Sequence, residues 1–408
     1  MSASSSKKPE VIIVGAGPAG STTAFFLARE GVKVTLIDQA VFPREKICGD
    51  GISPRAPYIM EKMGLLPWAE ENFPKQKVRL GAPDGTVVEA PGAPGDPPFD
   101  YEGFVIPRKI FDNALVERAV EVGAQLVEGT RITALERLTP DRVRAVGRQN
   151  GKQVTFEAPL LISAEGATSS LTRKLGLVPG PPESIATRQY FEEIDHEEPG
   201  LLEIHWEKSI LPGYGWIFHL GGGRANVGIG MYAQEALERK VNFHDLFETF
   251  ITNNPYARRV TEKARPVGLN RGFPLRMDAH AVTPYLDNVL VVGEAAGLVH
   301  PMSGEGIGPS MVCAEIAAAH ARKALERGDL SATQLASYGK VFQETFGRLH
   351  RTARFARKFM EIQPFVNRTM HRARHDAKVA ITLSKLIRGV ASPLSLMTPG
   401  MSLRVLMG

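Results

Sequence analysis

The clearest hydrophobic pattern lies near the start of the chain. Val11–Val14 is a continuous apolar run, a glycine-rich segment follows it, and apolar residues then recur at helical spacing over Ser21–Glu30. Val32–Ile37 is a second alternating run. A strand, a helix and a second strand in this order predict a βαβ unit of about thirty residues.

Farther along the chain, helical and strand-like periods alternate. Helices are predicted from Pro107 to about Val122 and from about Gly304 to Arg327. A hairpin is predicted across Asn150-Gly151, because Asn-Gly favours a two-residue turn. Short alternating stretches over 185–276 predict an antiparallel sheet that forms a second domain. We therefore expect an α/β protein with a Rossmann-like domain and a separate β domain.

The C-terminal residues show a third pattern, in which apolar side chains repeat at steps of three and four along one helical face. Its members are Phe342, Phe346, Leu349, Ala353, Ala356 and Met360. Residues 341–408 carry 12 Lys and Arg against 3 Asp and Glu, a net of +9, whereas residues 1–340 carry a net of −4. A basic amphipathic helix either lies on an anionic membrane surface or covers the protein's own core. No aromatic-rich stacking segment accompanies the charges, which argues against nucleic-acid binding.

Composition narrows the class of protein. A chain of 408 residues with 43% hydrophobic and 23% charged residues is typical of two or three globular domains. Two cysteines exclude a disulfide framework and a four-thiolate metal site. The first ten residues lack the apolar core of a signal peptide, and no run approaches the ~18 apolar residues of a spanning helix. We expect a cytoplasmic protein that reaches at most the inner face of a membrane; its oligomeric state is open.

The glycine-rich segment has the spacing of a dinucleotide fingerprint, Gly15-Ala16-Gly17-Pro18-Ala19-Gly20. Gly15 permits the tight turn, Gly17 lets the backbone approach a pyrophosphate, and Gly20 lets helix and strand pack closely. The helix N-terminus then receives the phosphates. Asp38, at the end of the second strand, is placed to accept hydrogen bonds from a ribose. The chain has one such fingerprint, which favours a single dinucleotide held as a prosthetic group.

Four separated motifs carry a more specific resemblance. They are the fingerprint, Lys46-Ile47-Cys48-Gly49-Asp50-Gly51-Ile52, Gly213-Tyr214-Gly215-Trp216-Ile217-Phe218, and Gly293-Glu294-Ala295-Ala296-Gly297 with Pro301 to Ile307. Over residues 10 to 325 the chain resembles the geranylgeranyl reductase family, within the flavoproteins related to p-hydroxybenzoate hydroxylase. The resemblance implies bound FAD and a glutathione-reductase-like FAD-binding domain over 1–80, 101–180 and 280–340. It also implies an inserted antiparallel substrate domain over 81–100 and 185–279, with 341–408 as a helical C-terminal region.

The resemblance implies FAD contacts at the fingerprint and at a further set of positions. That set is Asp38, Lys46, Cys48, Gly49, Arg108, Ile132, Gly166, Gly293, Glu294, Pro301, Gly304, Gly306 and Ile307. Glu294 and Glu165 stand where relatives usually have Asp, so the contact of Glu294 with the flavin side chain shifts by one methylene. Glu305 is expected to be a carboxylate at a helix start rather than a catalyst.

Five residues are candidates for contact with the reacting groups. The resemblance places Cys48 beside the flavin, where its thiol protonates the substrate or shapes the pocket. Tyr214, Trp216 and Phe218 alternate along one strand and therefore share a face, which is either an ordinary sheet core or, as in the family, the lining of a prenyl tunnel. His300, expected to be partly exposed near the flavin, is a candidate proton donor.

The implied activity is an FAD-dependent reductase that hydrogenates prenyl C=C bonds of a lipid or an isoprenoid quinone. A hydride from N5 of reduced flavin adds to one carbon and an acid supplies a proton to the other. NAD(P)H and ferredoxin both remain open as the electron donor. The alternatives are a group A flavin monooxygenase, a flavin-dependent halogenase and a redox-silent FAD scaffold. The segment from Tyr214 to Phe218 differs from the W-x-W-x-I-P pattern of the halogenases.

Overall fold

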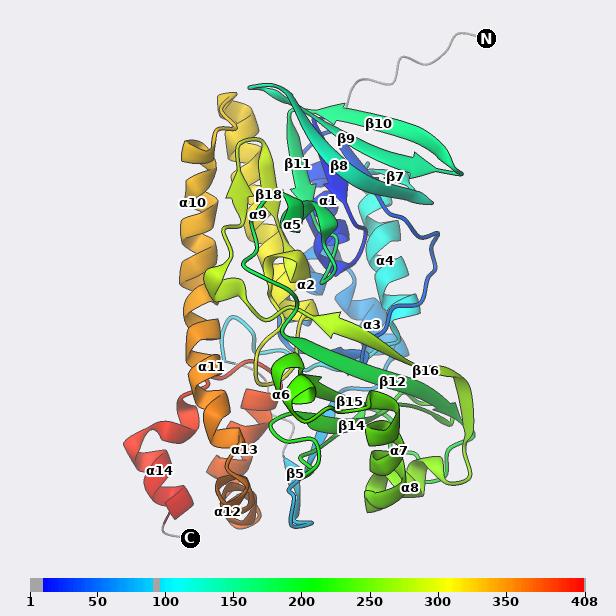
Figure 1. Ribbon diagram of the computed structural model, residues 1–408, viewed down its shortest axis with the longest axis vertical. Coiled ribbons are helices and arrows are strands. Elements are labelled where there is room, and N and C mark those ends of the chain that lie inside the picture. Colours follow the sequence, from blue (N-terminus) through cyan, green and yellow to red (C-terminus); the bar gives the residue numbers. More distant parts are fainter. Residues whose placement is uncertain (1–9, 91–95, 407–408) are drawn as a thin grey trace.

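The computed structural model describes residues 10–90 and 96–406. Figure 1 shows an elongated molecule in which one sheet and its helices form the upper half and a second sheet forms the lower half. Helices α9 (Ile307–Arg327), α10 (Ala332–Phe342) and α11 (Arg348–Met360) run along one side. Of the first ten residues, only Glu10 is among those described.

The upper half is built on the predicted βαβ unit, which the structure confirms. β1 (Val11–Val14) pairs in parallel with β2 (Val34–Ile37) and with β11 (Leu160–Ser163). The six-stranded sheet has the order β17-β18-β11-β1-β2-β7, with its other strands at Tyr285–Leu286, Val289–Val291 and Gln125–Val127. All residues of β1, β2 and β11 are buried, as expected of a parallel sheet covered on both faces.

Helices and a small sheet surround this core. Helix α1 (Pro18–Arg29) begins three residues before the predicted start, because Pro18 occupies the first turn, where its missing N–H costs nothing. The predicted hairpin is present, with left-handed Asn150 and Gly151 at its turn. It belongs to a three-stranded sheet of β8 (Thr130–Thr139), β9 (Arg142–Gln149) and β10 (Lys152–Ala158). The other helices of this half are α2 (Arg55–Met63), α3 (Leu66–Asn72), α4 (Arg108–Glu121) and α5 (Ser170–Lys174).

The lower half is a seven-stranded sheet with the order β16-β12-β15-β14-β13-β4-β5. Its strands are β4 (Lys77–Gly81), β5 (Val87–Ala90), β12 (Ser184–Glu192), β13 (Leu201–His205), β14 (Tyr214–His219), β15 (Arg224–Tyr232) and β16 (Arg265–Leu275). Neighbouring strands are antiparallel except β13 and β4. The boundary predicted at residue 80 falls inside β4, and residues 91–95 of the segment predicted over 81–100 lie outside the described part.

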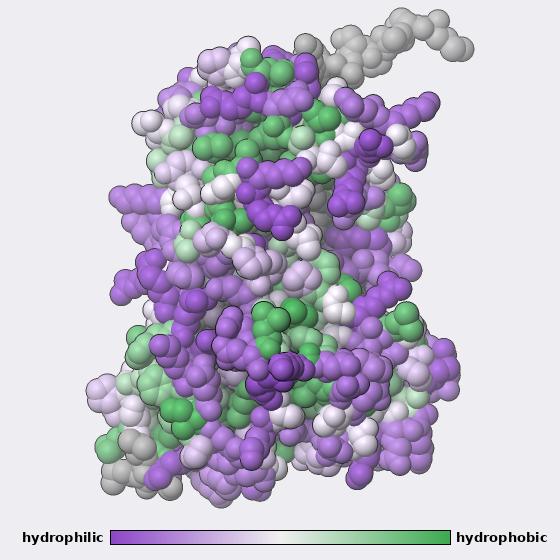
Figure 2. Space-filling view, viewed as in Figure 1, coloured by the Kyte–Doolittle hydropathy of each residue, from purple (hydrophilic) through white to green (hydrophobic). Residues whose placement is uncertain are grey.

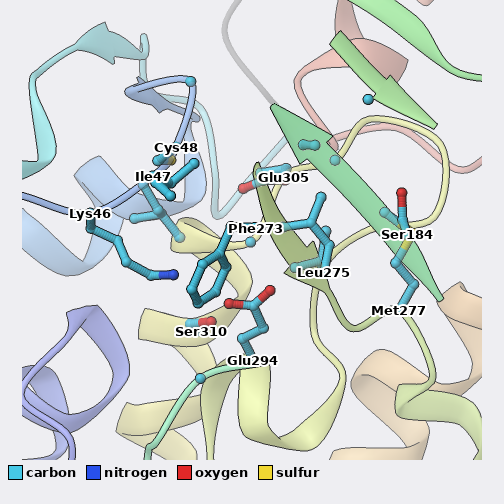
Figure 3. Close-up of a pocket in the computed structure, with 18 of the residues that line it drawn as sticks. Lys46, Ile47, Cys48, Ser184, Phe273, Leu275, Met277, Glu294, Glu305 and Ser310 are labelled. Carbon is cyan, nitrogen blue, oxygen red and sulfur yellow. The ribbon is translucent and has the colours of Figure 1, made fainter. Parts of the chain in front are cut away.

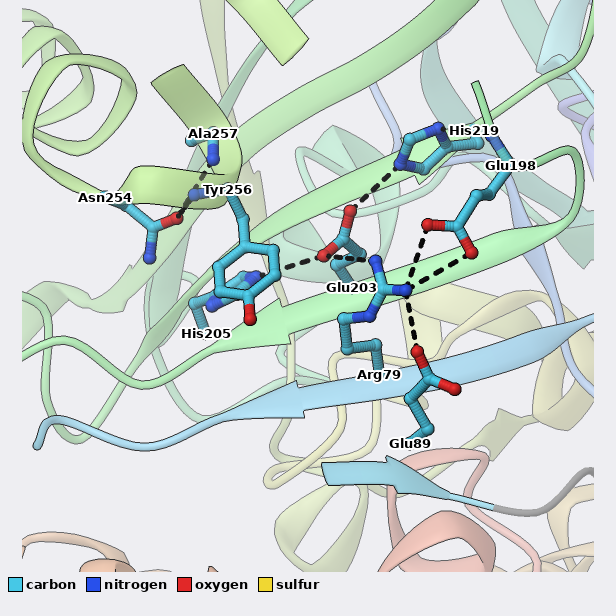
Figure 4. Close-up of polar contacts among 9 residues, drawn as sticks. All are labelled: Arg79, Glu89, Glu198, Glu203, His205, His219, Asn254, Tyr256 and Ala257. Atoms are coloured by element: carbon cyan, nitrogen blue, oxygen red, sulfur yellow. Dashed lines mark hydrogen bonds and ion pairs between the residues drawn. The ribbon is translucent and has the colours of Figure 1, made fainter. Parts of the chain in front are cut away.

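Alternation along β13 gives this sheet two different faces. Leu202 and Ile204 pack into an apolar cluster on one side, whereas Glu203 and His205 point to the other side, towards α7 (Phe243–Asn253) and α8 (Pro255–Thr261) (Figure 4). Glu203 is fully buried, with Nε2 of His219 3.0 Å from Oε1 and Nη1 of Arg79 3.2 Å from Oε2. Burial alone would raise the pKa of Glu203, but the two histidines and Arg79 outweigh it and hold the pKa well below its usual range.

The C-terminal region continues as a chain of helices that pack on the lower sheet. After α11 come α12 (Gln363–Ala373), α13 (Ala377–Ile387) and α14 (Pro399–Leu406). Their apolar faces are buried in one cluster with β4, β5, β13 and β14, through Val366, Met370, Val379, Leu383 and Leu386. Of the stripe predicted over 342–360, Phe342, Phe346, Ala353 and Ala356 are buried, which agrees with the interpretation that it covers the protein's own core. Among the described residues, none of the helices combines the length and hydrophobicity needed to span a bilayer.

Candidate active site

A cavity of about 710 Å³ has walls from both halves of the molecule and from the C-terminal helices. Its wall includes the fingerprint turn, the Cys48 loop, the Gly304 loop, one face of the lower sheet and residues of α13. Segments that lie far apart in the sequence therefore meet at one place. Figure 3 shows part of this wall, with Lys46, Cys48, Phe273 and Glu294 among the labelled residues.

The fingerprint turn leaves room for a dinucleotide. Gly15 has φ of +101°, and a Cβ there would overlap the backbone oxygen of Ala164. Gly17 is the N-cap of α1 and has no side chain to accept the first amides of the helix, so these face the cavity. Asp38 lines the cavity and is fixed by the amide of Ala16, whose nitrogen lies 2.7 Å from Oδ2. This is the geometry that a phosphate-bearing ligand requires.

Charged side chains border the same part of the cavity. Arg108 forms a bidentate pair with Asp112 at 2.6 and 2.7 Å, and Arg44 approaches the same carboxylate at 2.8 Å. Burial lowers the pKa of Lys46 to about 8, although Glu294 opposes the shift. Burial also raises the pKa of Glu294, whose Oε1 has no hydrogen-bond partner among the described residues. Cationic groups and an orphaned carboxyl oxygen fit the phosphates and the hydroxyl groups of FAD.

The loop before α9 forms the next stretch of wall. Gly304 has φ of +67°, and a Cβ there would lie 2.6 Å from the Tyr214 hydroxyl. Gly306 is the N-cap of α9, a helix of 21 residues that directs its positive end at this part of the cavity. Across the cavity wall, Gly49 packs against the Phe218 ring and Cys48 is a free, half-buried thiol. The positive helix end suits the negative charge of a reduced flavin.

The remaining wall is largely apolar. Tyr214, Trp216 and Phe218 all line it, and the Tyr214 hydroxyl and the Trp216 indole N–H both form hydrogen bonds with other protein groups. The Tyr214 hydroxyl donates to the Ser303 carbonyl at 2.6 Å, and the Trp216 indole donates to Asn226 at 3.0 Å. The C-terminal helices add Met360, Leu383, Leu386, Ile387 and Leu396. The cavity thus joins a polar end to an apolar one.

Most predicted site residues meet in this wall, where their roles towards FAD stay predictions. The lining includes Gly15, Gly17, Pro18, Ala19, Asp38, Lys46, Cys48, Gly49, Arg108, Ile132, Gly166, Glu294, Pro301, Gly304, Gly306 and Ile307. Ala16, Gly20 and Gly293 are not among the lining residues. A Cβ on Gly20 would overlap the Gly15 carbonyl, so this glycine allows close packing, as predicted.

The expectation of a partly exposed His300 is wrong. His300 is only 1% exposed, and it does not line the cavity. Nδ1 accepts hydrogen bonds from the amides of Met302 and Ser303, both at 3.3 Å, so the ring holds the loop together. Burial and the neighbouring His350 keep the pKa of His300 well below its usual range.

Several lining residues escaped prediction. Phe273 and Leu275 alternate at the end of β16 and Met277 follows at the same spacing, a pattern that could have indicated a shared face. Leu383 and Leu386 lie on α13, and nothing in their local sequence shows that they face a cavity. Glu305 also lines the cavity, and it does not cap a helix, because α9 begins at Ile307 with Gly306 as its N-cap.

Comparison with known proteins agrees with this geometry. The sequence model of an FAD binding domain matches residues 8–191, and that of a geranylgeranyl reductase catalytic domain matches residues 183–271. Menaquinone reductase of Mycolicibacterium smegmatis is 32% identical over 76% of this chain and 76% of its own. Digeranylgeranylglycerophospholipid reductase 1 of Methanopyrus kandleri is 32% identical over 87% of this chain and 90% of its own.

Solved structures extend the fold comparison to almost the whole chain. A geranylgeranyl bacteriochlorophyll reductase-like protein of Thermoplasma acidophilum covers 96% of this chain and 99% of its own, with a TM-score of 0.78 and 23% identity. A flavin-dependent brominase covers 97% of both chains, with a TM-score of 0.75 and 19% identity. These two likenesses show the fold, whereas the sequence relatives and the catalytic-domain match show the family. The predicted FAD cofactor and fold class are confirmed, and the chain belongs to the geranylgeranyl reductase family of FAD-dependent oxidoreductases.

Proposed function

We propose that this protein hydrogenates prenyl C=C bonds of a lipid or an isoprenoid quinone. The observation that carries the proposal is the apolar end of the cavity, where aromatic side chains of β14 and aliphatic side chains of α13 line one space with the FAD site. A long hydrocarbon chain can bury its surface there at roughly 25 cal/mol per Å². The sequence relatives, named for reduction of a digeranylgeranyl lipid and of menaquinone, support the same class of substrate.

The chain's own residues would hold and isolate the reactants. The fingerprint turn and the start of α1 would bind the pyrophosphate of FAD, with Asp38 at the ribose and Glu294 at the flavin side chain. When bound and reduced, FAD supplies a hydride equivalent. Trp216 and Phe218 would hold the prenyl chain extended and exclude water, which matters because an isolated alkene reacts only if it is closely positioned.

Two flavoenzyme alternatives share the fold. Group A monooxygenases and halogenases use dioxygen, and the brominase resembles this chain at only 19% identity. The relatives at 32% identity are named as reductases. The apolar part of the cavity that the C-terminal helices line also favours a prenyl chain over a compact aromatic substrate.

The proposal is tested with the purified, FAD-loaded protein under anaerobic conditions. Dithionite reduces the flavin, and geranylgeranylated phospholipid or menaquinone is then added while flavin absorbance is followed. We expect the flavin to reoxidise and the lipid to gain H₂ at a double bond, as measured by mass spectrometry. The fully saturated lipid is the control and should leave the flavin reduced. Reoxidation that requires dioxygen and leaves the prenyl chain unreduced would contradict the proposal.

We also propose that the outer face of α11 contacts an anionic membrane surface. Arg348, Arg351, Phe355 and Lys358 are exposed on that helix, and Phe355 is 54% exposed. Figure 2 shows hydrophobic side chains among hydrophilic ones over the C-terminal helices at the lower left. A basic face with apolar members suits an anionic lipid surface. We expect the protein to co-sediment with anionic vesicles but not with zwitterionic ones. The double variant Arg351→Glu with Lys358→Glu should reduce this binding, and equal binding to both kinds of vesicle would contradict the proposal.

A further inference from the structure

A buried carboxyl group in the cavity wall has no role in the site described so far. Glu305 lies between Gly304 and Gly306, and its side chain is 6% exposed. It lines the cavity together with the Cys48 loop and with residues of β14 and α13, and Figure 3 shows it among the lining residues. Its position places an acid in the same stretch of wall as the loop that faces the flavin end of the site.

The partners of Glu305 leave one carboxyl oxygen without a hydrogen bond among the described residues. The Ser53 hydroxyl donates to Oε1. Oε2 lies 3.6 Å from Nη1 of Arg55 and has no hydrogen-bond partner among the described residues. A Cβ on Gly389 would overlap Oε2, so the chain just beyond the end of α13 closes over the carboxyl group. Burial raises the pKa of Glu305, against the opposing effects of Arg55 and Ser53.

Given the reductase activity proposed above, we propose that Glu305 is the acid that protonates the substrate double bond. The O–H bond of the carboxyl group breaks and a C–H bond forms at one alkene carbon, while the other carbon takes the hydride that the proposed reaction already requires of reduced FAD. The π bond is lost and Glu305 is left as a carboxylate. Arg55 stabilises the new charge across 3.6 Å, and a proton from solvent restores the acid.

The two groups first considered as proton donors suit this step less well. His300 does not line the cavity, and its Nδ1 accepts two backbone hydrogen bonds. Cys48 does line the cavity, but a thiol is intrinsically a weaker acid than a carboxylic acid, and an isolated alkene is a poor base. Glu305 combines a place in the cavity lining, a carboxyl group that can carry a proton, and Arg55, whose positive charge stabilises the carboxylate left after proton transfer.

The experiment compares Glu305→Gln with Glu315→Gln in the FAD-loaded protein. Glu315 is the matched control, because it lies on α9, pairs with Lys62 at 2.7 Å and is not part of the cavity lining. Infrared spectroscopy without substrate should show a protonated-carboxyl band in the wild-type-minus-Glu305→Gln difference spectrum, and none in the wild-type-minus-Glu315→Gln spectrum. In anaerobic single turnover with geranylgeranylated phospholipid, the reduced flavin of Glu305→Gln should reoxidise at least ~100-fold more slowly than that of the wild type, since a general acid usually contributes that much to the rate. Glu305→Asp should recover part of the rate.

Each other outcome has a definite meaning. If the wild type fails to reduce the lipid, the proposed function itself falls. If the wild type reduces it and Glu305→Gln does so within about threefold of the wild-type rate, or the wild-type-minus-Glu305→Gln spectrum shows no carboxyl band, Glu305 is not the acid. If both Glu305 variants lose FAD or unfold while Glu315→Gln does not, the carboxyl group is structural and the inference is overturned.

Discussion

Glu203→Gln tests the buried ion network on the far side of the lower sheet (Figure 4). Glu203 is fully buried between the two histidines and Arg79. Removing one partner of a buried ion pair costs about 3–5 kcal/mol, since the remaining charge stays buried without compensation. Arg79 keeps Glu89 at 2.8 Å and Glu198 at 2.9 Å, so we expect a loss near the lower end, about 3 kcal/mol of the free energy of unfolding.

The matched control is Glu89→Gln, because Glu89 binds the same arginine with its side chain 76% exposed. Exposed pairs contribute within about 1 kcal/mol, so this variant should remain close to the wild type. Urea unfolding followed by tryptophan fluorescence measures both, since Trp206 and Trp216 lie in the affected domain. If Glu203→Gln costs no more than Glu89→Gln, the assignment of Glu203 as the centre of the network is refuted.

The same carboxylate makes a pH-dependent contribution. Its pKa is lower in the folded protein than the ordinary glutamate value of ~4.3. The stabilisation is therefore fully present above that value and is lost as the pH falls through the folded pKa. The stability difference between wild type and Glu203→Gln should be constant from about pH 5 to 8 and shrink in more acidic buffer. A difference that grows on acidification would contradict this sign.

Three further predictions concern the site. Gly15→Ala should weaken FAD binding roughly 10–100-fold, because its Cβ would overlap the Ala164 carbonyl oxygen and displace the turn, at a cost of ~1–3 kcal/mol. Gly123→Ala has a similarly positive φ of +110° but open space around it, so it controls for backbone strain and should leave FAD binding unchanged; FAD titration of the apoprotein decides. Lys46→Met should stabilise the apoprotein by up to about 3 kcal/mol at pH 7 while weakening FAD binding. The wild-type apoprotein should gain stability in urea between about pH 8 and 10.5, because its native state loses this proton before the unfolded state does. Leu386→Trp should raise the KM for a long prenyl chain about tenfold and that for a shorter one less, since the ring fills the lining at α13; equal changes for both chain lengths would contradict this assignment.

Local patterns were enough for the parts of the fold in which neighbouring residues determine the structure. The strand of Val11–Val14 and the Asn150-Gly151 turn follow from short-range propensity, and the structure contains both. Tyr214, Trp216 and Phe218 share a face because strand geometry requires it, and that face lines the cavity.

The remaining features depend on contacts between distant segments. The apolar stripe through Leu383 and Leu386 has the same sequence pattern whether it meets a core, a membrane or a substrate, and only the fold brings it to the cavity. His300 is buried because the Gly304 loop folds back and α11 brings His350 to 6.3 Å from it, which its own neighbours do not reveal. The environment of Glu305 depends likewise on Arg55 from α2 and Gly389 beyond α13.

The late position of α13 in the chain sets an order of assembly during synthesis. The strands and loops that form the nucleotide end leave the ribosome first, and domains generally fold as units from the N-terminus. The apolar end of the cavity is complete only after residues 377–396 have emerged and packed against the lower sheet. If a nascent or truncated chain bound FAD before that point, the reduced flavin would be exposed to dioxygen and water. The flavin would then be reoxidised by dioxygen instead of reducing the substrate, a side reaction that the completed cavity prevents.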